Sequence, residues 1–245
     1  NGLHPAAVTG RLISEKPESL KKNSNLVAVE LDSISSRINK VLNPEATVLH
    51  TGFEETRYPN GSFDLAITNV PFGNQVISDP NYDKSYPIHD YFIQKMIDQV
   101  RPGGLVVAIT SNGTMDKKND EARKNIARKA NLMNVLRLPD DVFKEAGTSV
   151  GTDILVFQKR EKELSQSDPL PEWCQASETD IMRGVTSGGT IHITYGDDDV
   201  MVNKYLQGQV AKVLGPPAVA SFGYGDRFSS RPPRSCEGQP RETLP

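Results

Sequence analysis

The sequence predicts an α/β protein built on a mostly parallel, doubly wound sheet with helices on both faces. Three observations over residues 1–160 favour this class. Apolar runs alternate with amphipathic stretches, the runs are too short for helices, and they are rich in Val, Ile and Leu. Continuous apolarity is typical of strands buried on both faces, and strand–helix alternation is typical of parallel sheets. Functional residues are therefore expected just after the strands, at the carboxyl edge of the sheet.

Six apolar runs are the candidate strands. Turn signals precede two of them, because Pro59-Asn-Gly61 stands before the third run and Pro102-Gly-Gly104 before the fourth. A strand before residue 5 would complete the sheet, but the chain holds almost none of it. The six runs are residues 25–31, 46–50, 63–68, 105–110, 132–138 and 153–158.

Three helical patterns lie between the strands. The first opens with a Ser that can cap a helix, and it places Ile34, Ile38 and Val41 on one face. The second repeats apolar residues every four positions, and the third is strongly charged. The three patterns cover residues 33–42, 88–100 and 116–129.

The third helical pattern carries basic side chains that could follow DNA phosphates. Acidic residues are interleaved with them, which favours a solvated helix face. The basic residues are Lys117, Lys118, Arg123, Lys124, Arg128 and Lys129.

The composition of the chain changes after residue 160. Residues 161–214 are expected to form a small appendage that begins with a linker at 164–171. Within it, residues 190–194 suggest a strand, and residues 200–206 suggest a short strand or helix. Residues 215–245 are rich in Pro, Gly, Ser and Arg, so they are expected to be a poorly structured, irregular tail.

Composition excludes several classes of protein. The chain of 245 residues has a net charge of −3, no apolar run long enough to span a membrane, and no secretory signal, and it reads as a fragment or a processed chain. Cys174 and Cys236 stand far apart without neighbouring His or Cys, which argues against a metal cluster or a disulfide framework. Free thiols indicate a reducing compartment, so we expect a cytoplasmic protein without a metal site.

The motif Asn69-Val-Pro-Phe72-Gly73 follows the third run directly. The Asn69 side-chain oxygen can accept one hydrogen of an exocyclic amino group, and a carbonyl of the segment stiffened by Pro71 can accept the other. The nitrogen lone pair then points at an electrophile, while Phe72 can stack on a planar base. A plain Asn-Pro turn after a strand is the competing interpretation.

Two other strand ends carry matching residues. Glu30 ends the first run, where an acid of such folds binds two ribose hydroxyls. Phe53 follows the second run and can cover an adenine face. The alternative role of Glu30 is to cap a helix, and that of Phe53 is to pack in the core. Three successive strand ends thus carry an acid, an aromatic residue and an Asn-Pro-aromatic motif. This combination is less expected by chance than any one of the three alone.

The chain resembles the adenine-specific DNA methylases, which are amino-methyltransferases that use S-adenosylmethionine. The resemblance covers roughly residues 5–160 and is greatest to the methylase domain of large methylase-helicase proteins of mobile elements and phages. Besides the motif at Asn69, it rests on Val29-Glu-Leu-Asp-Ser-Ile34, Gly52-Phe-Glu-Glu-Thr56, Ile88-His-Asp-Tyr-Phe92, Arg101-Pro-Gly-Gly104, Thr110-Ser-Asn-Gly-Thr-Met-Asp116 and Gly147-Thr-Ser-Val-Gly-Thr-Asp153.

The resemblance implies a function for each motif. A Rossmann-like methyltransferase domain over 1–160 would transfer a methyl group to the exocyclic amino group of adenine in DNA, as in restriction-modification systems. Asn69, Pro71 and Phe72 would hold a base flipped out of the duplex. The cofactor would contact Glu30, Phe53, Glu54 and the loop residues Pro5, Thr9 and Gly10. A helicase or recognition domain in a longer parent chain would be a further partner.

Two positions depart from the family pattern. The cofactor loop of the family reads Pro-x-x-Gly-x-Gly, and Val8 replaces the first of these glycines. A β-branched residue resists positive φ and fills space near the cofactor. The family often carries an acid at the position of Gly52, and Glu54 could substitute for it.

Three further side chains suggest structural roles. His89 and Asp90 begin a helix and are expected to cap and pack there, although acid–base catalysis was weighed for them. Trp173 is expected to be a docking contact rather than a base-stacking residue.

Three functional alternatives stay open. The Asn-Pro-aromatic motif also serves methylases of protein glutamine and of RNA bases. Val8 and the reduced first strand instead favour a catalytically silent module that binds DNA within a mobile-element protein. A nicotinamide dehydrogenase is disfavoured, because no G-x-G-x-x-G loop follows a strand.

Overall fold

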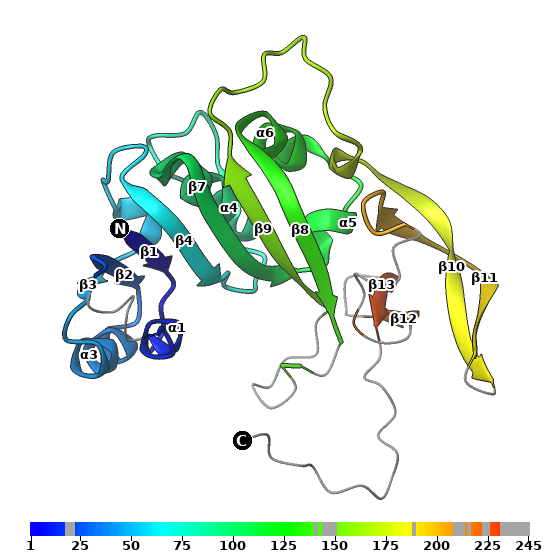
Figure 1. Ribbon diagram of the computed structural model, residues 1–245, viewed down its shortest axis with the longest axis horizontal. Helices are drawn as coiled ribbons and strands as arrows, with labels where there is room; N and C mark the ends of the chain where they lie inside the picture. The colour runs from blue at the N-terminus through cyan, green and yellow to red at the C-terminus, as the bar shows by residue number, and fades with distance from the viewer. Residues whose placement is uncertain are drawn as a thin grey trace, which may run out of the picture.

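The computed structural model describes residues 1–17, 23–139, 142–143, 151–187, 190–207, 214, 217–221 and 226–230. Figure 1 shows one twisted sheet with helices packed on it, and the hairpins β10–β11 and β12–β13 at one side. The architecture is the α/β class predicted by the alternating pattern.

The central sheet has seven strands in the order β3-β2-β1-β4-β7-β9-β8. Neighbouring strands from β3 to β7 are parallel, whereas β9 is antiparallel to both β7 and β8. The strand order reverses between β1 and β4, where ligands of doubly wound sheets bind. The strands are β1 (Gly2–Pro5), β2 (Leu26–Glu30), β3 (Thr47–His50), β4 (Phe63–Asn69), β7 (Val100–Ser111), β8 (Ala130–Leu138) and β9 (Thr152–Lys159).

The first strand is present, contrary to the expectation that the chain holds almost none of it. Gly2–Pro5 forms β1, which pairs in parallel with β2 on one side and β4 on the other. Leu3 is 1% exposed and belongs to the main core. Four residues suffice here because both edges of the strand find partners, so its backbone groups are paired.

Helices cover both faces of the sheet. Successive residues of β2 point to opposite faces, and accordingly Val29 lies in the main core while Ala28 lies in a second cluster with Ile13 of α1. The helices are α1 (Arg11–Ser14), α3 (Ser33–Leu42), α4 (Ile88–Gln99), α5 (Gly113–Asp116) and α6 (Glu121–Lys129), with the short 3-10 turns η1 (Phe53–Glu55) and η3 (Glu172–Cys174).

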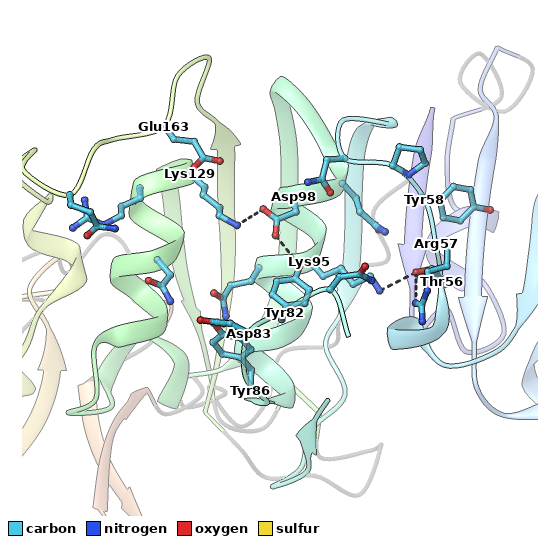
Figure 2. A pocket seen from close by; sticks show the side chains of 18 residues that line it. Thr56, Arg57, Tyr58, Tyr82, Asp83, Tyr86, Lys95, Asp98, Lys129 and Glu163 are labelled. Carbon is cyan, nitrogen blue, oxygen red and sulfur yellow. Dashed lines mark hydrogen bonds and ion pairs between the residues drawn. The ribbon is translucent and has the colours of Figure 1, made fainter. Parts of the chain in front are cut away.

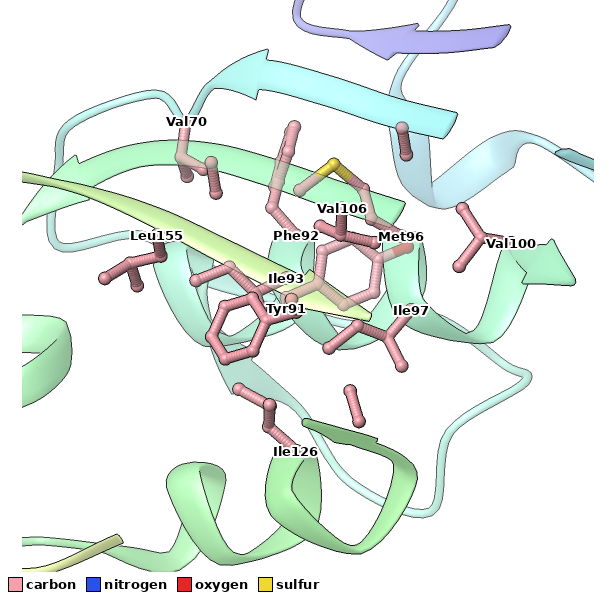
Figure 3. Close-up of a cluster of buried hydrophobic side chains, with 14 of the residues drawn as sticks. Val70, Tyr91, Phe92, Ile93, Met96, Ile97, Val100, Val106, Ile126 and Leu155 are labelled. Carbon is pink, nitrogen blue, oxygen red and sulfur yellow. The ribbon is translucent and has the colours of Figure 1, made fainter. Parts of the chain in front are cut away.

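The main core is built around α4. Ile93, Met96 and Ile97 are fully buried, and they pack with Val106 of β7 and Ile126 of α6. Figure 3 shows these side chains between α4, α6 and the sheet. The four-residue apolar repeat therefore predicted both the helix and its buried position.

The apolar side of α3 is exposed, which the amphipathic pattern did not suggest. Ile34, Ile38 and Val41 are 59%, 42% and 79% exposed, whereas Ser36 and Asn39 are fully buried. The polar side faces the loop after β1, where Asn43 donates to the carbonyl of Gly10. Close backbone packing against that loop requires short polar side chains, so it decides which side of the helix is buried.

The charged helix α6 is neither a phosphate track nor a fully solvated face. Arg123 is 1% exposed and donates to the carbonyl oxygens of Thr114, Lys117 and Cys174. Of the other basic residues, Lys117 pairs with Asp90. The expected solvated face is therefore present at Lys118 and Lys124, which are exposed, but not at Arg123, where the carbonyl of Cys174 replaces water.

A buried ionic cluster joins the carboxyl edge of the sheet to the C-terminal segment. Arg137 binds Asp153 with two hydrogen bonds of 2.8 Å and pairs with Asp116 at 2.7 Å. Asn203 donates from its backbone to Asp116 at 2.9 Å and from its side chain to the carbonyl of Trp173 at 2.8 Å. Burial raises the pKa of Asp116 even though Arg137 opposes that shift.

The segment after residue 160 packs on the sheet rather than hanging from it. Trp173 is 7% exposed and its ring lies 5.9 Å from that of Phe157, which agrees with the predicted docking role. Cys174, Val202 and Leu206 belong to the same core. These described side chains of the segment 161–214 therefore pack on the core of residues 1–160, while the division into a domain and an appendage stays a prediction.

Two antiparallel hairpins complete the described structure. β10 (Ala176–Ser187) pairs with β11 (Thr190–Asn203), and these strands include the predicted strand at 190–194. β12 (Pro217–Ser221) pairs with β13 (Asp226–Ser230), a hairpin that the expected irregular tail did not include. Cys236 and residues 231–245 lie outside the described residues.

Among the described residues, no helix is both long and apolar enough to cross a membrane. The same residues contain no group of three or more His, Cys, Asp or Glu side chains that could hold a metal ion.

Candidate active site

The expected functional residues gather at the carboxyl edge of the sheet, around β1. Pro5 ends β1 opposite Val29, so the loop that follows lies beside Glu30 at the end of β2. On the other side of β1, β4 ends at Asn69. The Thr68 hydroxyl donates to the carbonyl of Pro5 and ties β4 to the start of that loop. Glu30 and Asn69 thus stand at the ends of the two strands that flank β1, as the strand pattern predicted.

The loop after β1 contains left-handed backbone at three positions. Ala6 has φ 48°, Val8 has φ 49° and Gly10 has φ 79°. Such angles are uncommon for non-glycine residues and are outliers for a β-branched side chain. Val8 is 58% exposed. The strain expected from its β-branched side chain is thus present.

Gly10 is required by both its backbone angle and its surroundings. A Cβ atom at this position would lie 2.2 Å from Oδ1 of Asn39 and 2.4 Å from Nδ2 of Asn43. Both asparagines come from the buried polar side of α3. The absence of a side chain at Gly10 therefore lets the loop approach α3 closely.

Glu30 anchors the same loop. Its side chain is largely buried, Oε2 accepts the backbone N–H of Val8 at 2.7 Å, and Oε1 accepts the N–H of Asp32 at 2.8 Å. Each carboxylate oxygen has a second lone pair that these bonds leave available. Asp32, rather than Glu30, caps α3, because its side chain accepts the N–H of Ser35 at 2.7 Å.

The Asn69 side chain is exposed at the carboxyl edge and has no hydrogen-bond partner among the described residues. The next residue is anchored, since the N–H of Val70 donates to the carbonyl of Ile109 at 2.8 Å. Pro71 is half-buried. The segment is therefore held by its backbone while its amide group stays available.

The ring of Phe72 lies in an aromatic cluster. Its centroid is 6.0 Å from that of His89 at the start of α4 and 6.4 Å from that of Phe143. Sequence reasoning had not singled out Phe143, which precedes the motif beginning at Gly147. The available signal for Phe143 was its place as an aromatic residue between β8 and the glycine-containing motif that leads into β9. Residues 144–150, and with them most of that motif, lie outside the described residues.

Phe53 and Glu54 occupy η1, directly after β3. Phe53 is 3% exposed, and its ring packs 5.1 Å from Phe92. Phe53 therefore packs as a core side chain, which was the alternative to a contact with adenine. For the ring to cover an adenine, the ring or its neighbours would have to move. A Cβ atom at Gly52 would lie 2.2 Å from Oε1 of Glu54. The Glu54 carboxylate thus lies over Gly52, where an acid at position 52 would stand.

The two residues at the start of α4 pack rather than cap. His89 is mostly buried, its Nε2 has no partner among the described residues, and burial lowers its pKa. Asp90 pairs with Lys117. The imidazole of His89 is consequently neutral at pH 7. The expected cap of α4 is absent, because Pro87 precedes the helix and makes no side-chain hydrogen bond to it.

Lys95 and Asp79 form a buried ion pair that the sequence did not reveal. Their side chains are 5% and 0% exposed, and Lys95 Nζ lies 2.8 Å from Asp79 Oδ2. A lysine inside the apolar repeat of α4 was the only signal. The pair lies between the segment of Phe53 and the segment that follows Phe72.

A polar cavity of about 910 Å³ lies on the outer side of α4 and α6, away from Asn69 and Glu30. Figure 2 shows Lys95 reaching towards the carbonyl of Thr56 at its rim and Lys129 paired with Asp98. Tyr82 donates to the same aspartate at 2.8 Å. Asp98 therefore has both an ammonium partner and a phenol donor in this cavity, and none of the expected site residues lines it.

The sequence matches the family described as N-6 DNA Methylase over residues 21–172, which is more than half of the chain. Over 177 residues the chain is 34% identical to the defense against restriction protein B of Escherichia phage P1, which covers 69% of this chain and 8% of that protein. Over 101 residues it is 29% identical to the type I restriction enzyme StySPI methylase subunit of Salmonella potsdam, covering 39% of this chain and 19% of that subunit. The chain thus spans less than a fifth of either relative.

Solved structures confirm the fold. A protein of Vibrio vulnificus YJ016, described as a modification subunit of a type I restriction enzyme, superposes with a TM-score of 0.55 and 16% identity. The match covers 82% of this chain and 54% of that one. Together with the strand order, the match shows that the seven-stranded sheet has the fold of that subunit.

Proposed function

The chain belongs to the N-6 DNA methylase family, and from this premise we propose that it transfers a methyl group from S-adenosylmethionine to the exocyclic amino group of adenine in DNA. The observation that carries the proposal is the placement of Asn69. Its amide group is exposed and unpartnered among the described residues, and it lies one strand away from the loop anchored by Glu30. Asn69 can accept a hydrogen bond from an amino group, and the proposed cofactor loop lies beside it where the strand order reverses. This arrangement fits methyl transfer between two bound molecules.

Asn69, Pro71 and Phe72 hold the target base in this proposal. An amino group has two hydrogens, and the Asn69 oxygen accepts one while a backbone carbonyl of the segment accepts the other. Two acceptors keep the nitrogen lone pair out of the ring system and available for attack. Phe72 supplies a stacking face, and its neighbours His89 and Phe143 fix the ring.

The cofactor side uses Pro5, Thr9, Gly10, Glu30, Phe53 and Glu54. The free lone pairs of Glu30 fit a pair of ribose hydroxyls, and the glycine at position 10 lets the backbone approach a ligand. S-adenosylmethionine supplies an electrophilic methyl group. The residues of this chain bind, orient and exclude water, so rate enhancement comes from proximity and electrostatics.

The whole protein is proposed to act on DNA with further domains. Because both curated relatives are several times longer than the matched part, a recognition or helicase domain in a parent chain would select the site. Base flipping is implied, since a base in a duplex cannot reach a residue at the sheet edge. A cytoplasmic location fits Cys174, which is a buried free thiol.

A second candidate is a catalytically silent DNA-binding module. Two observations favour it: Val8 holds a glycine position at φ 49°, and Phe53 is closed into the core. Methylases of protein glutamine or of RNA bases share the motif at Asn69 and are the remaining alternatives.

The test is transfer of tritium from labelled S-adenosylmethionine to adenine-containing DNA, followed by digestion to nucleosides. We expect label in N6-methyl-2′-deoxyadenosine for the parent chain. Asn69→Ala should reduce transfer by more than a hundredfold, because loss of one such acceptor costs on the order of 3 kcal/mol. Asn60→Ala is the matched control, since Asn60 is an exposed asparagine away from the site.

Each alternative has its own outcome in this experiment. Equal transfer by the Asn69 variant and the parent would show that the motif is misassigned. Label in RNA or in protein glutamine instead of DNA would select those substrates. Absence of both transfer and cofactor binding would favour the silent module.

A further inference from the structure

Lys95 forms the centre of a buried hydrogen-bond network. Its ammonium group donates to the carbonyl of Phe53 at 2.7 Å, to Asp79 Oδ2 at 2.8 Å and to the carbonyl of Thr56 at 3.3 Å. The ammonium also lies 4.9 Å from the centre of the Phe53 ring. All three donors of this lysine are therefore used, two of them by the turn that carries Glu54.

Asp79 is equally well bound. Oδ2 also accepts the Tyr91 hydroxyl at 2.6 Å, while Oδ1 accepts the backbone and side-chain N–H groups of Asn81 at 2.9 and 2.8 Å. Burial raises the pKa of Asp79, but these donors and Lys95 outweigh burial and hold it at about 2. The carboxylate is thus charged at neutral pH and fixed in one position.

The network joins the two halves of the proposed site. On the cofactor side, the Phe53 and Thr56 carbonyls belong to the chain that follows β3 and bears Glu54. On the base side, Asp79 ends the segment that starts at Phe72. That segment is pinned to α4, since the N–H of Ile88 donates to the carbonyl of Gln75 at 2.9 Å.

Stability alone does not account for a buried ion pair. Removing two charges from water costs several kcal/mol per ion, and a well-packed apolar pair of similar volume is often as stable or more so. What the pair adds is a definite geometry. If η1 moves, the ammonium must follow its two carbonyls or lose them, and Asp79 must follow the ammonium.

We propose that Lys95, through Asp79, is a positioning residue that couples cofactor binding at η1 to target-base capture by the segment after Phe72. The inference rests on the proposed function. Ordering of η1 by the cofactor fixes Lys95, Lys95 fixes Asp79, and Asp79 holds the segment that places Phe72. DNA and cofactor therefore each bind more tightly in the presence of the other, as linkage requires.

The experiment measures the dissociation constant of sinefungin, an unreactive cofactor analogue, by calorimetry with and without saturating random-sequence duplex DNA. The parent chain should bind sinefungin at least about fivefold more tightly with DNA, which is the lower end of typical coupling. Lys95→Met should bring this ratio to within about twofold of one. Lys84→Met is the matched control, because Lys84 is an exposed lysine paired with Glu121 and should keep the parental ratio.

Circular dichroism establishes that each variant is folded. If Lys95→Met does not fold, Asp79→Asn replaces it, since the amide keeps the shape and loses the charge. A parent ratio of one overturns the proposal. Variants that weaken sinefungin but retain the parental ratio overturn it as well, because a purely structural role predicts that result. A parent that binds no sinefungin contradicts the proposed function itself, and the coupling with it.

Discussion

The backbone N–H of Val8 donates to Oε2 of Glu30 at 2.7 Å. One carboxylate at the end of β2 therefore fixes the loop after β1 in addition to the ribose contact proposed for it. The bond also holds Val8 in its left-handed conformation, at φ 49°. Under the proposed function, the geometry of the loop and the affinity for the cofactor both depend on the Glu30 side chain. Substitutions of Glu30 and of Val8 separate these two effects.

Glu30→Ala should weaken S-adenosylmethionine binding far more than DNA binding. The substitution removes the acceptor of the Val8 N–H and the two acceptors proposed for ribose, a loss of roughly 2 to 3 kcal/mol, or about 30- to 150-fold in affinity. Calorimetry with the cofactor and a separate DNA titration measure the two effects. The exposed Glu45 offers the control Glu45→Ala. Unchanged cofactor affinity in a parent that does bind would exclude Glu30 from the site.

Gly10→Ala should destabilise the fold by more than Gly61→Ala. Both glycines have φ 79°, so both substitutions carry the same backbone strain of about 1 kcal/mol. A Cβ atom at Gly61 has only one neighbour, at 3.8 Å, whereas one at Gly10 meets Asn39 at 2.2 Å. Overpacking adds typically 1 to 3 kcal/mol. Urea denaturation of the two variants gives the difference.

A partner substitution tests the cause of that difference. Asn39→Ala in the Gly10→Ala background should recover part of the lost stability, because it removes the atom that the new methyl group would meet. Additive losses in the double variant would mean that strain elsewhere in the loop, rather than contact with Asn39, sets the cost.

The sequence predicted the fold and the strand ends because both depend on local patterns. Buried runs such as the one ending at Glu30 are continuous in sequence, and parallel strands bring their carboxyl ends to one edge. The same logic placed Asn69 beside the loop at Pro5. These predictions needed no knowledge of contacts between distant segments.

The failures concern side chains whose burial is set by distant contacts. Ile34 is exposed because α3 turns its short polar residues to the loop at Gly10, which periodicity alone does not encode. Arg123 is buried because the carbonyl groups of Cys174, Thr114 and Lys117 replace water. Lys95 was missed because a lysine in an apolar repeat has no visible partner until Asp79 folds against it.

Stability should decrease between about pH 6.5 and pH 4 because of His4. Burial in β1 lowers its pKa from 6.5 to about 4, against backbone hydrogen bonds that raise it, and Nδ1 has no partner among the described residues. The unfolded chain therefore binds the proton more tightly, so stability is complete above pH 6.5 and declines as the pH falls towards 4. At pH 5 the loss from this group alone is about 2 kcal/mol relative to pH 7.5.

The histidine variants isolate that contribution. Urea midpoints at the two pH values should converge in His4→Gln, which cannot titrate. His50→Gln, at an exposed histidine, is the matched control. An unaltered pH dependence in the His4 variant would assign the acid sensitivity to other groups.

Val8→Gly should separate backbone strain from obstruction of the cofactor. Val8 has its left-handed angle in the folded chain, so relief of strain should stabilise the fold. Strain at such positions costs about 1 to 3 kcal/mol, while the glycine loses roughly 0.5 to 1 kcal/mol in chain entropy. A net gain of about 1 kcal/mol in unfolding free energy is expected from urea denaturation.

Affinity for S-adenosylmethionine reports the other contribution. If the proposed cofactor loop is right, removal of the exposed Val8 side chain clears the path of the cofactor and should tighten binding roughly tenfold. Val8→Ala distinguishes the causes, since it removes the branched methyl groups but keeps the strained angle. It should gain affinity without gaining stability, whereas Ala6→Gly, at φ 48° in the same loop, should gain stability without affinity. If Val8→Gly and Val8→Ala both bind no more tightly than the parent, the side chain does not lie in the path of the cofactor, and residues 5–12 serve the fold rather than the ligand.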